Sequence, residues 1–406
     1  MLPELAWRNL WRQPRRTFLN LLTISFAAAA AVFVSSLQRG GYAEVEQNAL
    51  HLIDGYAQIQ PRGYSNDPDL RRTITDPQEL VARLNKLPGI TAVAPRASSY
   101  AIVSLNQRSY GSAVFGVDPR KETNLSALSG AIVRGRYLRP GDTDSVVLGE
   151  GLARNLNLSP GKKIMLLGAA RDGSVAADFL TVTGIFSTGV SQLDHQVIEM
   201  PLSRFQTDFA LGHRINVIAI TGSSLPAVEA DLPALEMIAG QSGLVVRNWT
   251  NLEPALHDAI LIDSAVSHMC YVSLLVIIVF IILNTLLMTV LERTKEFGML
   301  LAIGMRPSEI GRVLWFELLF LALIGICFGI LIGVGVTLWD SKYGIPIAGA
   351  QALFAQWHMS AVAYPKLTLH STIVGPLEIA TGIILAGIVP YLRINRLQPV
   401  AAMRSS

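Results

Sequence analysis

Two carboxylates stand inside otherwise apolar stretches, where an ionisable side chain is rare. Glu317 and Glu378 would each be costly to bury in such surroundings, so each is a candidate for proton transfer or substrate binding. Glu378 lies about two turns from one end of its stretch, close to Pro376, and is the better intramembrane polar candidate. A carboxylate that faces a partner helix explains the presence of Glu378 in this stretch equally well. Glu317 lies within about one turn of the end of its stretch, and we expect its side chain to reach the polar interface.

A second unusual segment combines charges with an apolar, helix-like run. It contains Glu292, Arg293, Lys295, Glu296, Phe297, Gly298, Met299 and Leu300, and it closes with Gly304 and Arg306 before Pro307. An apolar patch between charges in a short loop indicates a protein partner. An apolar face resting on a membrane surface is the alternative.

The chain carries few signs of catalysis. It has no His-Glu-x-x-His, no Gly-x-Ser-x-Gly and no cluster with metal-ligand spacing, and its histidines are scattered. A phosphate-binding loop ending at Gly161-Lys162-Lys163 would need glycine where Leu156 stands. Cys270 and Cys327 both lie in apolar runs. We therefore predict no catalytic residue, no metal and no cofactor bound by this chain.

The elements that must position these residues are membrane spans. Residues of the AVILMFWYC set make up 51% of the 406 residues and charged residues only 16%, against about 25% in soluble proteins. A net charge of +3 is too small for a nucleic-acid-binding protein. Four apolar stretches reach the roughly 20 residues that cross a bilayer. They are 17–37, 269–291, 313–339 and 372–392. The first could instead be a signal peptide, but its apolar run is longer than a signal core.

Basic residues next to the spans predict the orientation, because they resist translocation. Segments 1–16, 292–312 and 393–406 are rich in arginine and are expected in the cytoplasm, while 38–268 and 340–371 are expected outside. Both termini are then cytoplasmic. Residues Leu2 to Trp11 have helical spacing with an apolar face, which predicts an interfacial helix. A plain basic flank is the alternative.

The segment 38–268 is long enough for one large domain or two small ones, and its pattern is mixed α/β. Helices are expected at Asp76–Leu87, Glu150–Leu156, Leu202–Phe209, Leu225–Ile238 and Leu252–Ser267, the last running into the second span. Strands are expected at Ile90–Ala94, Tyr100–Leu105, Ser112–Val117, Val146–Leu148, Lys163–Leu167, Phe179–Phe186, Ile215–Ile220 and Leu244–Val246. The sequence thus predicts four transmembrane α-helices with a large extracytoplasmic α/β (α+β) domain between the first and second.

The third span carries glycines at four-residue spacing. Gly325, Gly329 and Gly333 form overlapping Gly-x-x-x-Gly steps, a surface that lets another helix approach closely. The pattern predicts helix packing, within the chain or between chains.

The segment Glu292 to Arg306 closely resembles the cytoplasmic coupling loop of FtsX-like ABC transporter permeases, the group that includes MacB-type and lipoprotein-releasing permeases. The ending Leu397-Gln398-Pro399-Val400-Ala401-Ala402-Met403-Arg404 and the entry Leu5-Ala6-Trp7-Arg8-Asn9-Leu10 are similar to those of the family. Gly116-Val117-Asp118-Pro119, Gly135-Arg136 and Val147 to Ala153 are similar to the MacB-type periplasmic core. The resemblance covers nearly the whole chain.

This resemblance implies a permease that does no chemistry itself and works by mechanotransmission in a bacterial inner membrane. ATP and Mg would bind a separate ABC ATPase partner that contacts Glu292 to Arg306. A second permease copy, identical or related, membrane lipid, a lipoprotein cargo and a periplasmic acceptor are the other expected partners. Gly55-Tyr56-Ala57-Gln58-Ile59-Gln60 is similar to lipoprotein-releasing permeases and favours extraction of lipoproteins or lipids. A MacB-type efflux permease and a membrane-anchored sensor with a periplasmic ligand-binding domain are the alternatives.

Overall fold

The computed structural model describes residues 2–346 and 362–394, and these residues form two compact units. One unit is helical and comprises residues 2–43, 260–346 and 362–394. The other is the domain Glu44–Ala259. Most of the predicted tail 393–406 and the middle of the predicted loop 340–371 lie outside the described residues.

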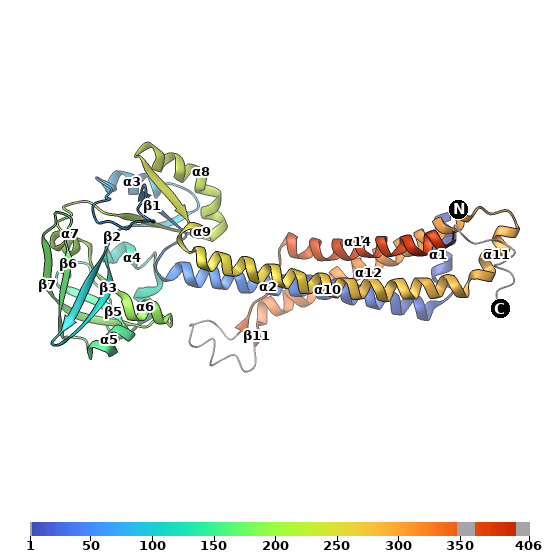
Figure 1. The fold of residues 1–406 in the computed structure, drawn as a ribbon, viewed down its shortest axis with the longest axis horizontal. Coiled ribbons are helices and arrows are strands. Elements are labelled where there is room, and N and C mark those ends of the chain that lie inside the picture. The colour runs from blue at the N-terminus through green and yellow to red at the C-terminus, as the bar shows by residue number, and fades with distance from the viewer. Residues whose placement is uncertain (1, 347–361, 395–406) are drawn as a thin grey trace. The chain divides into compact units, whose positions relative to one another are not determined.

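The helical unit contains four long apolar helices. They are α2 (Pro14–Leu52), α10 (Pro254–Glu292), α12 (Pro307–Tyr343) and α14 (Leu369–Ile394), and each is long and apolar enough to cross a membrane. Two short helices accompany them, α1 (Leu2–Leu10) and α11 (Thr294–Ala302) (Figure 1). Strands β11 (Ile345–Pro346) and β12 (Val362–Ala363) pair antiparallel. The predicted membrane architecture is confirmed.

Helix α10 is one continuous helix of 39 residues. At a rise of 1.5 Å per residue it is about 59 Å long, roughly twice the thickness of the hydrocarbon core of a bilayer. The prediction that the helix from Leu252 to Ser267 runs straight into the second span is therefore confirmed, although the helix begins at Pro254.

The domain is built on a ten-stranded sheet in the order β10-β1-β9-β2-β3-β8-β5-β7-β4, with β6 pairing with β2 and β7. Most pairs are antiparallel, but β3 and β8 run parallel, as do β5 and β7. The strands are β1 (Ala57–Pro61), β2 (Ile90–Leu105), β3 (Arg108–Val117), β4 (Ile132–Gly135), β5 (Ser145–Gly149), β6 (Lys163–Ala169), β7 (Val175–Phe186), β8 (Val197–Pro201), β9 (Val217–Gly222) and β10 (Leu244–Asn248).

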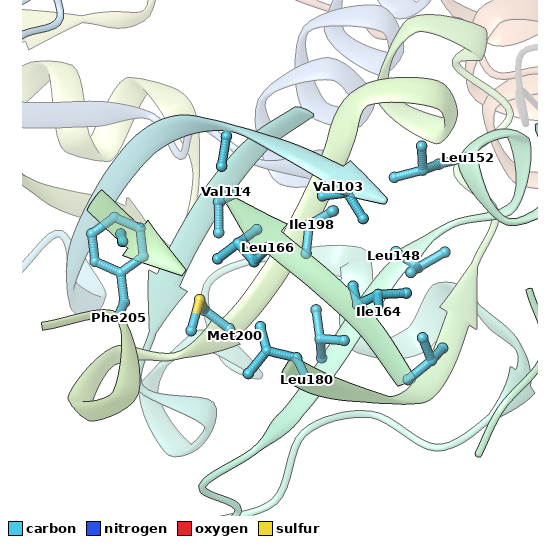
Figure 2. Packing of buried hydrophobic residues seen from close by; sticks show 14 of the residues in the cluster. Val103, Val114, Leu148, Leu152, Ile164, Leu166, Leu180, Ile198, Met200 and Phe205 are labelled. Atoms are coloured by element: carbon cyan, nitrogen blue, oxygen red, sulfur yellow. The ribbon is translucent and has the colours of Figure 1, made fainter. Parts of the chain in front are cut away.

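Short helices connect the strands. They are α3 (Pro77–Leu84), α4 (Pro119–Glu122), α5 (Glu150–Leu156), α6 (Ser191–Gln196), α7 (Leu202–Asp208), α8 (Leu225–Gln241) and α9 (Trp249–Leu252), together with a 3₁₀ turn at Ala127–Ala131. Inward-facing side chains of β2, β3, β5, β6, β7 and β8 interdigitate with α5 and α7 in the largest core cluster (Figure 2). Phe205 and Phe209 of this core stack with their ring centroids 4.2 Å apart. Burial of these side chains gives the domain its stability without a disulfide.

The predicted elements of the domain need corrections. Ile90–Ala94 and Tyr100–Leu105 are one strand, which continues through Pro95 because at Pro95 the strand is paired with β9 alone, and its pairing with β3 begins only at Arg96. Strands β1, β4 and β8 are not among the predicted ones. The predicted helix Asp76–Leu87 begins at Pro77 and ends at Leu84, four residues before Pro88.

Candidate functional site

A largely buried ion pair lies where α10 turns into α11. Arg293, in that turn, donates from Nη1 to both oxygens of Glu317 on α12, at 3.2 and 3.3 Å. Its Nε donates to Glu296 of α11 at 3.3 Å. Asn9 of α1 donates from Nδ2 to Glu317 Oε1 at 2.8 Å. The side chains of Arg293 and Glu317 are only 15% and 12% exposed, so this carboxylate joins three segments of the chain.

That Glu317 reaches the polar interface stays a prediction. The apolar pattern placed the start of the third span at Val313, but α12 begins at Pro307, so Glu317 lies ten residues, or about 15 Å, into the helix. Its oxygens accept hydrogen bonds from Arg293 and Asn9. Neither partner could be paired with it from the sequence, because both belong to segments outside the predicted apolar stretches.

Two further ion pairs join α2 and the linker before it to the same region. Arg16 Nη2 lies 2.5 Å from Glu292 Oε1, and Arg12 Nη1 lies 3.7 Å from Glu296 Oε2. These pairs are partly exposed, so each contributes at most about 1 kcal/mol. The first pair links α2 to the end of α10, and the second links the linker before α2 to α11.

Helix α11 has a buried face and an exposed face. Phe297 packs in a small core with Val290, Ile310, Leu314 and Ile394, and the Arg293 guanidinium lies 5.3 Å from the centroid of the Phe297 ring. Gly298 is buried beside it. On the other face Met299 is 58% exposed, and just after the helix Ile303 is 84% exposed.

The predicted coupling residues therefore divide into two groups. The side chains of Arg293, Glu296 and Phe297, with the buried backbone at Gly298, hold α11 in place, while Glu292, exposed at the end of α10, pairs with Arg16 of α2. Lys295, Met299, Leu300, Gly304 and Arg306 are exposed. Gly304 has φ +103°, a backbone conformation that favours glycine, and it reverses the chain before α12. Arg306 precedes α12, where its backbone amide donates to Glu309 Oε2 at 3.0 Å.

The glycine stripe of α12 packs against α2 within the same chain. A Cβ added at Gly329 would come within 2.5 Å of the Ala28 Cβ, and one at Gly333 within 2.9 Å of the Ala29 carbonyl oxygen. Ser25 Oγ donates to the Gly325 carbonyl at 2.9 Å. The glycine pattern predicted packing either within the chain or between chains, and the structure shows packing within the chain.

Glu378 lines a cavity of about 550 Å³ between α2, α10 and α14. Tyr271 reaches across from α10, donating its hydroxyl to the Gly375 carbonyl at 2.9 Å. Tyr42 donates to Asp263 Oδ2 at 2.6 Å in the same wall. The wall alternates hydroxyls and charges with apolar side chains such as Val34 and Val374. Such a cavity suits an amphiphilic molecule, with both a polar and an apolar part.

The domain buries a separate charged cluster. Arg96 of β2 forms an ion pair with Glu122 of α4 and donates to the Ile53 carbonyl. Tyr137 donates to Glu199 Oε2 at 2.6 Å. Burial, together with the neighbouring Glu122, raises the pKa of Glu199 from 4.5 to about 8. The single carboxylate inside the apolar run Val197-Ile198-Glu199-Met200 was the available sequence signal for this cluster.

Among residues 2–346 and 362–394, no group of three or more His, Cys, Asp and Glu side chains is arranged to hold a metal ion. The described residues form a short helix, α11, which is packed on one face and carries exposed apolar side chains on the other. This helix is joined to a bundle of long apolar helices. Together with the separate α/β domain, these features are those of a polytopic membrane protein.

Comparison with known proteins identifies the family. Residues 17–235 match the MacB-like periplasmic core domain, and residues 269–399 match the FtsX-like permease C-terminal region. The chain belongs to the FtsX-like permeases with a MacB-like periplasmic core domain, and it is an ABC transporter permease subunit.

Its relatives include two kinds of permease. The lipoprotein-releasing system transmembrane protein LolC of Neisseria meningitidis is 23% identical, with 98% of each chain covered. LolE of Haemophilus influenzae, from the same kind of system, is 23% identical over 99% of this chain and 98% of its own length. The macrolide export ATP-binding/permease protein MacB of Hyphomonas neptunium is 25% identical over 99% of this chain, which spans 60% of that protein.

Proposed function

We propose that this chain extracts lipoproteins or other lipid-anchored molecules from the inner membrane by mechanotransmission, driven by a separate ATPase subunit. ATP and Mg bind that partner, and this chain performs no chemistry. Two permease chains, identical or related, pair in the complex. The amino terminus, the turn from α10 to the start of α12 and the carboxyl terminus face the cytoplasm.

The observation that carries the proposal is the two-faced helix α11. Phe297 and Arg293 fix one face of α11 to the helix bundle. A force that the ATPase exerts on the other face of α11 is therefore transmitted to the bundle. The exposed face offers Met299 and Ile303, which are apolar side chains that a partner can cover. The membrane surface is the other place where they could be buried, and copurification of the ATPase separates the two.

Two observations support a lipid-anchored cargo. The relatives covered over nearly their full length are named as proteins of lipoprotein-releasing systems. The cavity beside Glu378 combines polar and apolar walls, which suits a lipid-anchored molecule. The relation to MacB favours a second candidate, export of an amphiphilic small molecule by the same mechanism.

The partner is tested by purifying the full-length protein in mild detergent and quantifying the ATPase that copurifies. We expect Met299→Glu to reduce the recovered ATPase at least tenfold, because a carboxylate would be buried in an apolar contact. Met237→Glu is the matched control, since Met237 is 68% exposed on α8 of the domain. If Met299→Glu recovers as much ATPase as the unchanged protein, the proposed contact is overturned. If Met237→Glu loses as much ATPase as Met299→Glu, the effect is nonspecific and does not support the contact.

The cargo is tested with the purified complex in proteoliposomes. Addition of ATP should release a triacylated lipoprotein to a soluble acceptor, and should not do so with the Met299→Glu complex. Transport of a macrolide without lipoprotein release would favour the export function instead.

A further inference from the structure

A groove of about 490 Å³ lies between α12 and α14, at the end where α12 begins and α14 finishes. Six side chains that line it are Arg312, Trp315, Phe316, Leu319, Ile388 and Tyr391. This groove is separate from the turn that carries Met299 and from the cavity beside Glu378, and neither the proposed partner nor the proposed cargo accounts for it.

Two glycines give the groove its shape. A Cβ at Gly311 would come within 2.7 Å of the Tyr391 ring, so the absent side chain lets that ring lie against α12. At Gly387 of α14 the approaching side chain is Leu318, which is buried between the two helices. The helices therefore touch at these points, while Trp315 and Tyr391 form aromatic walls beside the contact. Tryptophan and tyrosine favour the depth of lipid headgroups.

Positive charge lies beside the groove. Arg312 is exposed there, and within the described part of the chain it forms no ion pair; its Nε donates only to the Ser308 carbonyl, at 3.4 Å. The carboxylate of Glu309, one turn away, caps the amide of Arg306. Arg393, in the last turn of α14, adds a second exposed cation at the same end of the bundle. The first turns of α12 contribute the positive end of a helix dipole.

The wall of the groove is apolar, and Arg312 stands at its edge. Leu319 lies seven residues, or about 10 Å along the helix axis, from Arg312. Between them only Phe316 and Trp315 face the groove, and Ile388 faces it from α14. About 10 Å is one third of the hydrocarbon core, a depth that an acyl chain fills when its headgroup stays at the surface.

We propose that this groove binds one anionic phospholipid, with its phosphodiester at Arg312 and an acyl chain along Phe316, Leu319 and Ile388. Basic pockets between transmembrane helices on the cytoplasmic side of a membrane bind acidic headgroups in this way. The bound lipid holds α12 and α14 together below the turn that α11 forms. The proposal depends on the membrane spans alone and stands whether or not the cargo is a lipoprotein.

The test uses full-length protein in nanodiscs of equal parts phosphatidylglycerol and phosphatidylcholine. After extraction in mild detergent, native mass spectrometry counts the lipids that remain bound. We expect Arg312→Gln to lower retained phosphatidylglycerol about fivefold and to leave phosphatidylcholine unchanged. Leu319→Trp fills the apolar part at an exposed position, and should lower retention of both lipids.

The matched control is Arg15→Gln, which removes one exposed arginine at the start of α2, outside the groove. Retained phosphatidylglycerol should match that of the unchanged protein. If Arg312→Gln retains as much phosphatidylglycerol as the unchanged protein, or if Arg15→Gln loses as much, the site is refuted and any retention is a bulk charge effect. Thermal unfolding of each variant in the same nanodiscs verifies that it is folded.

Discussion

The ion pair between Arg293 and Glu317 is expected to hold the turn into α11 in place. Replacing Glu317 with Leu leaves the Arg293 guanidinium buried without its main partner, and breaking a buried pair on one side costs about 3 to 5 kcal/mol. Glu296 still accepts from Arg293 Nε at 3.3 Å, so we expect the lower end, about 3 kcal/mol. Glu317→Gln keeps an acceptor for Asn9 and should cost about half as much.

The double variant Arg293→Met/Glu317→Leu removes both charges at once. Replacing a buried pair with apolar side chains is often neutral, so the free energy of unfolding should return to within about 1 kcal/mol of that of the unchanged protein. The assay is reversible unfolding in mixed micelles with increasing dodecyl sulfate, followed by tryptophan fluorescence. Glu292→Leu is the control, because its pair with Arg16 is partly exposed and should contribute at most about 1 kcal/mol.

The double-mutant cycle measures how strongly the two side chains interact. The interaction energy is the loss of unfolding free energy in the double variant minus the sum of the losses in Arg293→Met and Glu317→Leu measured separately. A sum of single losses that equals the loss in the double variant would mean that Arg293 and Glu317 act independently, and the role of the pair in holding the turn would be refuted.

Three other positions give sharper tests of packing and charge. Gly329→Leu should destabilise the bundle by about 1 to 3 kcal/mol in the same unfolding assay, because its Cβ would meet Ala28, whereas Gly335→Leu, with open space around it, should have little effect. Glu199 binds a proton in the folded domain up to about pH 8, and the unfolded chain loses it near pH 4.5. The free energy of unfolding should therefore fall as the pH rises between these values. In thermal unfolding at pH 5.5, 7 and 8.5, Glu199→Gln should make stability depend less on pH. The same pH dependence in the variant and the unchanged protein would refute this role of Glu199. Asn157 ends α5 with φ +54°, so Asn157→Ala should lower stability by about 1 kcal/mol and Asn157→Gly should not, by the same thermal measurement.

The long helices could be predicted from the sequence because their signal is local. A run such as Met269–Leu291 is apolar on every side, and no tertiary contact is needed to recognise it. The ends of the helices were harder to predict from the sequence. The first turns of α12 carry Ser308, Glu309 and Arg312, which lower the hydropathy, although Pro307 at the first helical position marks the start.

The strands of the domain show where local patterns lose information. Strand β1 reads Ala-Gln-Ile-Gln-Pro, yet all of Ala57 to Gln60 is buried, because β9 and β10 flank it on both sides. Gln60 donates to Gln58 and Gln58 to Asp54, so the polar side chains satisfy each other inside the domain. Burial of this kind depends on partners about 160 to 190 residues away, which a window of sequence does not contain.

The candidate site divides in the same way. Resemblance to the family selected the stretch from Glu292 to Arg306, and the structure sorts its side chains into those that anchor and those that are exposed. The anchor itself was missed because it is made by three segments distant in sequence, Asn9, Arg293 and Glu317. Only folding of the chain brings them within hydrogen-bonding distance.

Under the proposed mechanism, the arrangement within the helical unit gives the short loop a packed connection to the long helices. Arg293 and Phe297 fix α11 to α12, and Gly325, Gly329 and Gly333 let α12 pack directly on the backbone and the short or branched side chains of α2. Close-packed contacts of this kind transmit displacement because they leave little room for side chains to move. A force applied at Met299 would therefore reach α2 through two rigid contacts, and the variants at Glu317 and Gly329 interrupt them one at a time.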